Sequence, residues 1–353
     1  MSDPSHDLID GIAALRSKLS DAKTMISKRI IGQEDVVNLS LIALLCGGHG
    51  LLVGVPGLAK TLLVETLGTV MGLDSKRVQF TPDLMPSDIL GAEVLETGSD
   101  GSRMFKFIEG PIFCQLMMAD EINRASPRTQ SALLQAMQEK QVTIAGQHRK
   151  LAAPFHVLAT QNPIEQEGTY PLPEAQLDRF LLQIDVGFPS PEAERAILIA
   201  TTSADEEEAS PVFTADELIA AQRLVRRMPI GDSVVDAILR LVRSARPGEE
   251  EAFDFIDRTV SWGPGPRAAQ ALMLAVRARA LMDGRLAPDL EDVLALARPA
   301  LTHRMALTFA ARAEGDTVER VIDAIAQHGL FQRGAILIGT LAYQCYPLLL
   351  GAT

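Results

Sequence analysis

The stretch from Gly54 to Leu62 constrains the fold of this chain more than any other segment. It reads Gly-Val-Pro-Gly-Leu-Ala-Lys-Thr-Leu, follows the apolar run His49–Val53 and leads into a helix-like segment ending near Leu67. A strand, a tight glycine loop, a Lys-Thr pair and a helix together form a phosphate-binding unit for nucleoside triphosphates. Backbone N–H groups of the loop and of the helix N-terminus would hold the phosphates. This assigns nucleotide binding to Gly54, Val55, Pro56, Gly57, Leu58, Ala59, Lys60, Thr61 and Leu62.

Lys60 and Thr61 have separate roles in such a loop. Lys60 would reach the β- and γ-phosphates, and the Thr61 hydroxyl would be a ligand of Mg²⁺. The usual pattern has glycine directly before the lysine, where this chain has Ala59. One added methyl group still allows an α-region backbone there. Taken alone, the loop leaves open a simple glycine turn with a surface lysine.

Two later apolar runs end in polar residues. Ile112–Ala119 leads into Asp120 and Glu121, and Phe155–Thr160 leads into a segment that contains Asn162. At the carboxyl edge of a parallel sheet, Asp120 would hold Mg²⁺ through its water shell, and Glu121 would polarise the attacking water. Asn162 would hydrogen-bond the γ-phosphate or that water. The alternatives are a solvated acidic turn and an Asx turn at the end of a strand.

With these residues assembled, the chain resembles the MoxR family of AAA+ ATPases over roughly residues 28–305. The resemblance rests on Gly-Val-Pro-Gly-Leu-Ala-Lys-Thr, Ala-Asp-Glu-Ile-Asn-Arg-Ala, Ala-Thr-Gln-Asn-Pro-Ile-Glu and Tyr-Pro-Leu-Pro-Glu-Ala-Gln-Leu-Asp-Arg-Phe. It implies ATP and Mg²⁺ as ligands, with Asn162 as sensor 1, Arg179 as the arginine finger and Arg267 as sensor 2. It also implies that Ile31, Gly32 and Gln33 lie near the adenine. The alternatives are a local ion pair of Arg179 with Asp178, and a capping role for Arg267 in its helix region.

The predicted fold class is α/β, a P-loop AAA+ core with a parallel five-stranded sheet, followed by an all-α helical lid. Strands are expected near residues 50–53, 77–80, 115–119, 156–160 and 182–186, with ligands at their carboxyl ends. Helices are expected over 8–30 and, in the second half, near 232–245, 267–282, 289–298 and 315–328. The predicted domains are an N-terminal helix (1–30), the ATPase core (31–188), the lid (189–310) and a C-terminal helical extension with an apolar tail (311–353).

Two hairpins are expected to interrupt the core, over Glu93–Ile108 and Gln141–Leu151, each with a turn signal at its centre. The resemblance places the first as an insert and the second before sensor 1. In related ring ATPases such hairpins face the central pore or a partner, and the alternative is a pair of surface loops without a function.

Composition excludes several classes of function. The net charge of −12 over 353 residues disfavours sequence-independent binding of nucleic acid. The three cysteines lie in apolar surroundings without metal-ligand spacing, as expected of buried thiols in a reducing cytosol. The polar, acidic first ten residues do not resemble a secretory signal. The uncharged segment 334–353 is long enough for a membrane span, but a buried terminal helix or a subunit contact is favoured.

The resulting expectation is a cytoplasmic, ATP-hydrolysing MoxR-type ring, a homo-oligomer and specifically a hexamer, that remodels a client protein. The resemblance adds a von Willebrand factor A domain protein as a partner. An arginine finger acts on a neighbour's nucleotide, so Arg179 itself indicates oligomerisation. Two alternatives remain: a nucleic-acid-stimulated translocase or loader, and a nucleotide-gated scaffold with little turnover.

Overall fold

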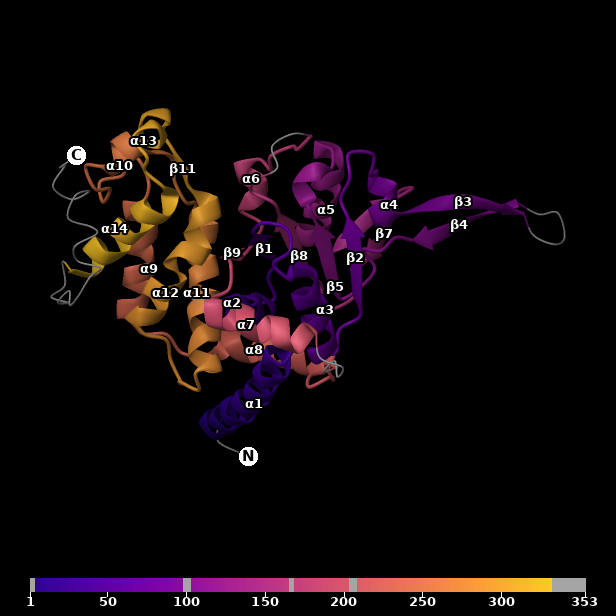
Figure 1. Ribbon diagram of the computed structural model, residues 1–353, viewed down its shortest axis with the longest axis horizontal. Helices are drawn as coiled ribbons and strands as arrows, with labels where there is room; N and C mark the ends of the chain where they lie inside the picture. Colours follow the sequence, from indigo (N-terminus) through magenta and orange to yellow (C-terminus); the bar gives the residue numbers. More distant parts are fainter. Residues whose placement is uncertain (1–3, 98–102, 165–167, 203–207, 332–353) are drawn as a thin grey trace. The chain divides into compact units, whose positions relative to one another are not determined.

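The computed structural model describes residues 4–97, 103–164, 168–202 and 208–331 (Figure 1). The chain divides into two compact units. One contains the described parts of residues 17–180 and 184–223, and the other contains those of 1–16, 181–183 and 224–353. The domain boundaries given above stay a prediction.

A five-stranded sheet, in the order β2-β5-β8-β1-β9, forms the centre of the first unit. The pairs β2/β5, β5/β8 and β8/β1 are parallel. The fold class and the five expected strands are therefore confirmed, with ends that shift by no more than a few residues. The strands are β1 (Gly50–Val53), β2 (Ser75–Gln79), β5 (Leu116–Asp120), β8 (His156–Gln161) and β9 (Leu182–Asp185).

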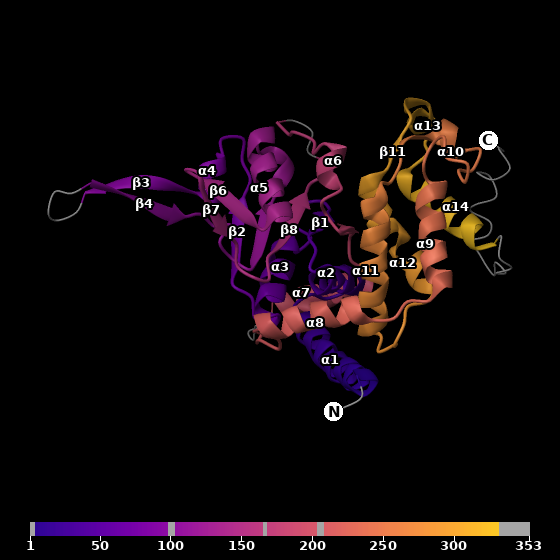
Figure 2. The same cartoon turned by 180° about the vertical axis from the view of Figure 1, so that it is seen from behind.

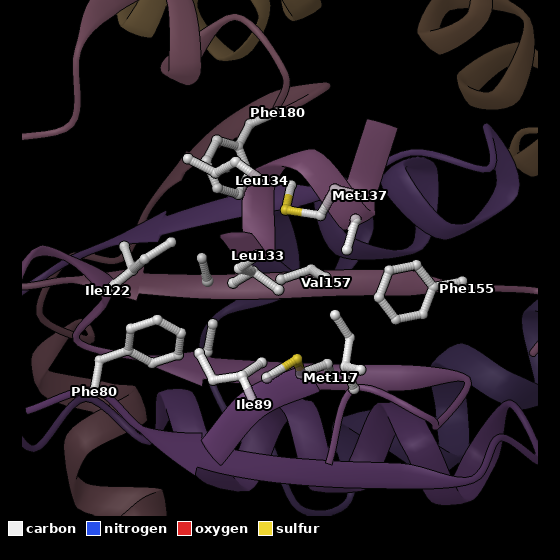
Figure 3. Close-up of a cluster of buried hydrophobic side chains, with 14 of the residues drawn as sticks. Phe80, Ile89, Met117, Ile122, Leu133, Leu134, Met137, Phe155, Val157 and Phe180 are labelled. Carbon is white, nitrogen blue, oxygen red and sulfur yellow. The ribbon is translucent and has the colours of Figure 1, made fainter. Parts of the chain in front are cut away.

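Helices flank the sheet because their apolar stripes pack against its faces. Strand β5 is buried along its whole length, as a central parallel strand covered on both faces should be. Figure 3 shows Met117 of this strand within a buried cluster that includes Leu133 and Leu134 of α5. The elements are α1 (Pro4–Ser27), α2 (Glu34–Leu45), α3 (Lys60–Val70), α4 (Pro86–Leu90), η1 (Ile122–Arg124), α5 (Pro127–Glu139), α6 (Glu174–Leu177), α7 (Pro191–Thr201) and α8 (Ala215–Arg227).

Both expected hairpins are present. Strands β3 (Gly91–Thr97) and β4 (Arg103–Glu109) pair antiparallel, as do β6 (Gln141–Ile144) and β7 (Gln147–Lys150). Figures 1 and 2 both show the β3–β4 ribbon extending away from the sheet. At its base the Arg149 guanidinium stacks over the Phe107 ring, 3.8 Å from the ring centre, and so connects the two hairpins.

The second unit is largely a helical bundle of α9, α11, α12 and α14. It also contains a short antiparallel pair, β10 with β11, so the expectation of a purely helical lid needs that addition. Its elements are α9 (Asp232–Ser244), α10 (Ile256–Thr259), β10 (Val260–Trp262), α11 (Pro266–Met282), α12 (Leu290–Leu301), η2 (Thr302–Arg304), β11 (Ala306–Leu307), α13 (Phe309–Ala313) and α14 (Val318–Phe331).

The apolar tail, 334–353, lies outside the described residues. Among the helices that the structure does describe, none combines the length and the apolar character needed to cross a membrane.

Candidate active site

The loop between β1 and α3 contains two glycines at which a side chain would be unfavourable. A Cβ added to Gly54 would lie 2.5 Å from the backbone oxygen of Val186. Gly57 has a φ of +86°, in the left-handed region that favours glycine, and an added Cβ would meet no atom within 4 Å. The chain therefore turns sharply at the end of β1 and keeps open space on one side of the loop.

The N-terminus of α3 faces this loop. The helical hydrogen bonds begin with the one from the Leu63 N–H to the Ala59 oxygen, at 2.9 Å. The N–H groups of Lys60, Thr61 and Leu62 precede that bond, so they are the donors that a helix N-terminus presents to an anion. Ala59 itself has φ 54° and ψ 21°, which is left-handed rather than the α-region backbone expected from the sequence.

Lys60 folds back onto its own loop. Its Nζ donates to the backbone oxygens of Gly54 (2.7 Å) and Val55 (2.6 Å). Burial lowers the pKa of Lys60, and the carboxylates of Asp120 and Glu121 oppose that effect. The ammonium group is thus held at the mouth of the phosphate loop, close enough to the two acidic residues to interact with them electrostatically.

Asp120 ends β5 and is buried, so its charge requires partners. One carboxylate oxygen, Oδ1, accepts a 2.6 Å hydrogen bond from the Thr160 hydroxyl. The other, Oδ2, accepts two from Arg77 of the neighbouring strand β2, at 3.1 Å from Nε and 2.6 Å from Nη2. Both oxygens of the predicted metal-holding carboxylate are therefore engaged by side chains from the adjacent strands.

Glu121 follows directly and adopts an unusual backbone, with φ 55° and ψ 51°. Its N–H donates to the Thr160 hydroxyl oxygen at 2.8 Å. Its Oε2 accepts from Gln79 Nε2 (2.7 Å) and Arg124 Nη1 (2.9 Å). A glutamate in the left-handed region is strained by about 1–3 kcal/mol, a condition that is concentrated at functional sites.

Asn162 lies just beyond β8 and is buried. Its Oδ1 accepts from the Ile164 N–H at 3.1 Å, which is an Asx-type turn. This turn is compatible with the predicted role of Asn162. The turn uses the amide oxygen, whereas a hydrogen bond to a phosphate or a water would be donated by the amide nitrogen.

A cavity of about 490 Å³ brings these residues together. It is lined by Pro56, Gly57, Leu58, Ala59, Lys60, Thr61, Leu62, Asp120, Glu121, Thr160 and Asn162. Its volume is within the range of small-molecule binding sites. Segments more than 100 residues apart in the sequence therefore meet at the carboxyl edge of the sheet.

Other predicted residues lie elsewhere. Ile31, Gly32 and Gln33 lead into α2, and Gln33 Nε2 donates to the Leu58 oxygen at 3.4 Å, which connects this segment to the phosphate loop. Arg179 follows α6, is half-buried and is not among the residues that line the cavity. Arg267 is exposed in the first turn of α11, in the other compact unit.

The segment before Arg179 is nevertheless attached to the site. The Tyr170 N–H donates to the Asn123 oxygen at 2.7 Å, and Gln130 Nε2 donates to the Tyr170 oxygen at 2.9 Å. Asn123 belongs to η1, which begins directly after Glu121. The chain entering the Pro-Leu-Pro run is thereby fixed to the turn that carries the predicted base.

These residues fit ATP and Mg²⁺. The left-handed Gly57, the loop N–H groups and Lys60 suit a polyphosphate. The Thr61 hydroxyl and the Asp120 carboxylate are the hard oxygen donors that Mg²⁺ prefers. Among the described residues there is no group of three or more His, Cys, Asp or Glu that could hold a metal. Mg²⁺ is commonly held by one or two protein ligands plus substrate phosphates and water.

Arg77, Gln79, Arg124 and Thr160 were missed by the sequence reasoning. Thr160 stands inside the Ala-Thr-Gln-Asn run, where a hydroxyl near the end of a buried strand was an available signal. Arg77 and Gln79 alternate on β2, which shows that they share a face, but it does not show which carboxylates they face.

Comparison with known proteins agrees with this geometry. The ATPase family associated with various cellular activities (AAA) matches residues 49–182, and the AAA lid domain matches residues 255–325.

Three proteins are similar along most of their length. Chaperone MoxR1 of Mycobacterium tuberculosis is 40% identical over 328 residues, which cover 92% of this chain and 86% of MoxR1. The protein YeaC of Bacillus subtilis is 42% identical over 314 residues, covering 88% and 94%. The crystal structure of a Cytophaga hutchinsonii protein assigned as an ATPase has a TM-score of 0.83 and 37% identity, covering 90% and 96%.

The phosphate loop, the acidic strand end and the matches along the chain have one explanation. The chain belongs to the MoxR family of AAA+ ATPases.

Proposed function

We propose that this protein binds MgATP in the cavity between the phosphate loop and the ends of β5 and β8, and hydrolyses it. The observation that carries the proposal is the convergence of Lys60, Asp120, Glu121 and Asn162 on that cavity or its mouth. Lys60 and the N–H groups of α3 would hold the phosphates. Thr61 and Asp120 would hold Mg²⁺, which when bound neutralises charge on the phosphate oxygens.

Glu121 is the proposed general base. Its carboxylate lines the cavity beside the phosphate loop, and its backbone is held by Thr160. It would orient a water and accept its proton, while Asn162 donates a hydrogen bond to the γ-phosphate or to that water. Gln79 and Arg124 both donate to Oε2 of this carboxylate, so they orient it, and Oε1 is the oxygen proposed to accept the proton.

Arg179 is the proposed arginine finger of a homo-oligomeric ring, specifically a hexamer, and Arg267 the proposed sensor 2. Two observations support the role of Arg179. It does not line the nucleotide cavity of its own subunit, and it ends a segment that is attached to η1. Charge that develops on a transferred phosphoryl group needs a cation, and a finger arginine from the neighbouring subunit supplies one. Ile31, Gly32 and Gln33 are proposed to lie near the adenine, supported by the Gln33–Leu58 hydrogen bond.

Subunit mixing tests the ring ATPase. Lys60→Ala subunits would keep the finger but lack a working pocket, and Arg179→Ala subunits would have the reverse defect. Each variant alone should be nearly inactive, and the mixture should regain part of the phosphate release of the wild type. If labelled subunits demonstrably co-assemble and no activity returns, Arg179 does not act across the interface.

Remodelling of a client protein in the cytoplasm is the proposed role, with a von Willebrand factor A domain protein as a partner. The relative from M. tuberculosis is named a chaperone. The β3–β4 ribbon offers a contact surface, since Met104 is 67% and Phe105 is 73% exposed at its far end. A pull-down with Glu121→Gln, which should hold ATP without turnover, tests this role. Recovery of the same proteins by Lys60→Ala would argue against nucleotide-dependent capture.

A nucleic-acid-stimulated translocase is the second candidate, and charge argues against it. The net charge of −12 gives little electrostatic attraction to a polyanion. Single- and double-stranded DNA and RNA should leave the ATPase rate unchanged at low salt. A several-fold stimulation that disappears as salt rises would favour the translocase. Binding of ATP without measurable turnover would instead favour a nucleotide-gated scaffold.

A further inference from the structure

The ion pair between Arg77 and Asp120 has a feature that distinguishes it from an ordinary strand-to-strand contact. Both of its hydrogen bonds go to one oxygen, Asp120 Oδ2, from Nε at 3.1 Å and from Nη2 at 2.6 Å. The Asp120 side chain is 12% exposed, whereas the Arg77 side chain is 48% exposed. A solvated cation is thus attached to the carboxylate that is proposed to hold the metal.

We propose that Arg77 is a displaceable stand-in for the metal cation at Asp120, and that Mg²⁺ and Arg77 compete for this carboxylate. The inference rests on the proposed function, because it requires Mg²⁺ to be held through Asp120. It adds a positioning residue, Arg77, that sets the affinity for the metal.

Burial explains why a stand-in is needed. A carboxylate removed from water is strongly destabilised unless a cation or hydrogen-bond donors compensate its charge. Thr160 compensates one oxygen, but a hydroxyl is a neutral donor. Arg77 is the cation that contacts the other oxygen, so it compensates the carboxylate and holds its orientation when no metal is bound.

The two donors of Asp120 differ in how easily they can leave. Thr160 is 1% exposed, and its hydroxyl bridges Asp120 Oδ1 and the Glu121 N–H, so its removal would break two buried hydrogen bonds. Arg77 lies on β2 at the edge of the sheet, and water can solvate its guanidinium directly. Asp120 needs a cation but not this one: a metal could take over the compensation, and water would solvate the half-exposed Arg77 guanidinium, so Arg77 is the donor that a metal displaces.

Displacement of Arg77 would also reach Glu121. Nη2 of Arg77 donates to Gln79 Oε1 at 3.1 Å, and Gln79 Nε2 donates to Glu121 Oε2 at 2.7 Å. The Gln79 amide is therefore held between the cation and the proposed base. When Arg77 leaves Asp120, Gln79 loses a constraint on its orientation, which connects arrival of the metal to release of Glu121.

A measurement of metal affinity distinguishes an Arg77 that competes with the metal from an Arg77 whose ion pair is purely structural. Electron paramagnetic resonance titration with Mn²⁺, at saturating ADP, measures binding of the metal without any turnover. We expect Arg77→Gln to bind Mn²⁺ about three- to fivefold more tightly than the wild type, the size expected when an ion pair worth up to about 1 kcal/mol no longer competes with the metal. Arg77→Lys should give an intermediate value, because one ammonium replaces a two-donor fork.

Arg124→Gln is the matched control. It removes the same charge from the same edge of the sheet, but Arg124 forms its ion pair with Glu121 rather than Asp120. Its Mn²⁺ affinity should stay within about twofold of the wild type, since only the long-range field changes. Metal-free binding of ADP, measured by calorimetry in EDTA, should be the same in Arg77→Gln and the wild type.

An unchanged or weaker Mn²⁺ affinity in Arg77→Gln would overturn the stand-in role, as would an equal gain in Arg124→Gln. Asp120→Asn distinguishes this failure from failure of the proposed function. If Asp120→Asn binds Mn²⁺ as tightly as the wild type, then Asp120 does not hold the metal and the proposed metal site itself is wrong.

Discussion

The two ends of the parallel sheet differ in the kind of polar group that they carry and in how those groups are paired. At the carboxyl ends, Asp120 and Glu121 form ion pairs with partly exposed arginines. At the amino ends, His49 precedes β1 and His156 begins β8, and both are buried and neutral at physiological pH. One end therefore has carboxylates with partly exposed partners, and the other has neutral rings held largely by backbone groups.

Each histidine at the amino end has its tautomer fixed. The Val157 N–H donates to His49 Nδ1 at 3.0 Å, so the proton of His49 is on Nε2, which faces the Met137 oxygen at 3.3 Å. His156 Nδ1 donates to the Gly48 oxygen at 2.8 Å, and its Nε2 accepts from Gln222 at 3.1 Å. A second proton on either ring would point toward a hydrogen-bond donor, the Val157 N–H for His49 and the Gln222 amide for His156.

The carboxyl end carries backbone strain at the site itself, although Lys140, near the two histidines, also has a left-handed backbone (φ 52°). Ala59 and Glu121 both have left-handed backbones, with φ of 54° and 55°. Residues other than glycine adopt this conformation at a free-energy cost of about 1–2 kcal/mol. Ion pairs with partly exposed arginines at one edge, against buried neutral groups at the other, support an amino edge that provides stability and a carboxyl edge that provides the proposed function.

The largest expected effect is the loss of stability in acid through the amino end. Burial, helped by the neighbouring His156, lowers the pKa of His49 to about 3, and burial lowers that of His156 to about 4. Unfolded histidine titrates near 6.5, so between pH 6.5 and about 4 the unfolded chain binds more protons and stability falls with falling pH. The two groups together should lower the free energy of unfolding by up to about 4 kcal/mol between pH 7 and 5.

Urea unfolding at pH 7, 6 and 5 measures this dependence. His156→Gln removes one of the two proton-binding sites and should roughly halve the slope of the free energy of unfolding against pH. A stability profile that is flat over this range would show that the amino end is not held by neutral histidines.

Glu121→Gln should give the second-largest effect, at the carboxyl end. Loss of a positioned general base commonly lowers kcat by about 100-fold or more, while binding of ATP should persist because the phosphate loop is untouched. Phosphate release and calorimetry separate turnover from binding. Glu139→Gln, an exposed change on α5, is the control and should retain full activity; equal rates in both variants would remove Glu121 from catalysis.

Thr160→Val should have a smaller effect on both stability and turnover. The change is nearly isosteric but removes the hydroxyl that bridges Asp120 Oδ1 and the Glu121 N–H, which leaves both buried groups short of a partner. Destabilisation of about 1–3 kcal/mol is expected. Thr160→Ser keeps the hydroxyl and should restore kcat, whereas equal kcat in Thr160→Val and the wild type would contradict a positioning role.

Ala59→Gly should have the smallest effect. Glycine relieves the left-handed strain at φ 54° but adds conformational freedom to the unfolded chain, so the net gain in stability should be at most about 1 kcal/mol. The control, Ala200→Gly near the end of α7, should destabilise by up to about 1 kcal/mol. Thermal unfolding of both variants measures the difference. Loss of stability in Ala59→Gly would show that the loop is not strained at this position.

Local pattern was sufficient to predict much of this molecule. The phosphate loop and the Asp120–Glu121 pair lie at the boundaries of strongly apolar runs, so their placement at one sheet edge followed from the parallel fold. Arg77 and Gln79 could not be assigned to their carboxylates. The register that sets Gln79 opposite Asp120 connects segments 41 residues apart.

Three further elements were not predicted. Helix α7 has no buried residue, so it leaves no periodic apolar signal. Strands β10 and β11 are three and two residues long, which is too short for such a signal. The left-handed backbone of Ala59 follows from the closed geometry of the loop rather than from alanine's own preference.

Calorimetric titration of ATP into the wild type, Lys60→Ala and His156→Gln tests the contrast between the two ends most directly. The Lys60 ammonium at the loop mouth should interact with the phosphates, so Lys60→Ala should weaken ATP binding by at least about tenfold, the loss expected for a charge-assisted contact. His156→Gln, at a pH where it is folded, should bind ATP as the wild type does. Wild-type affinity in Lys60→Ala, or a tenfold loss in His156→Gln, would contradict the assignment of function to the carboxyl edge.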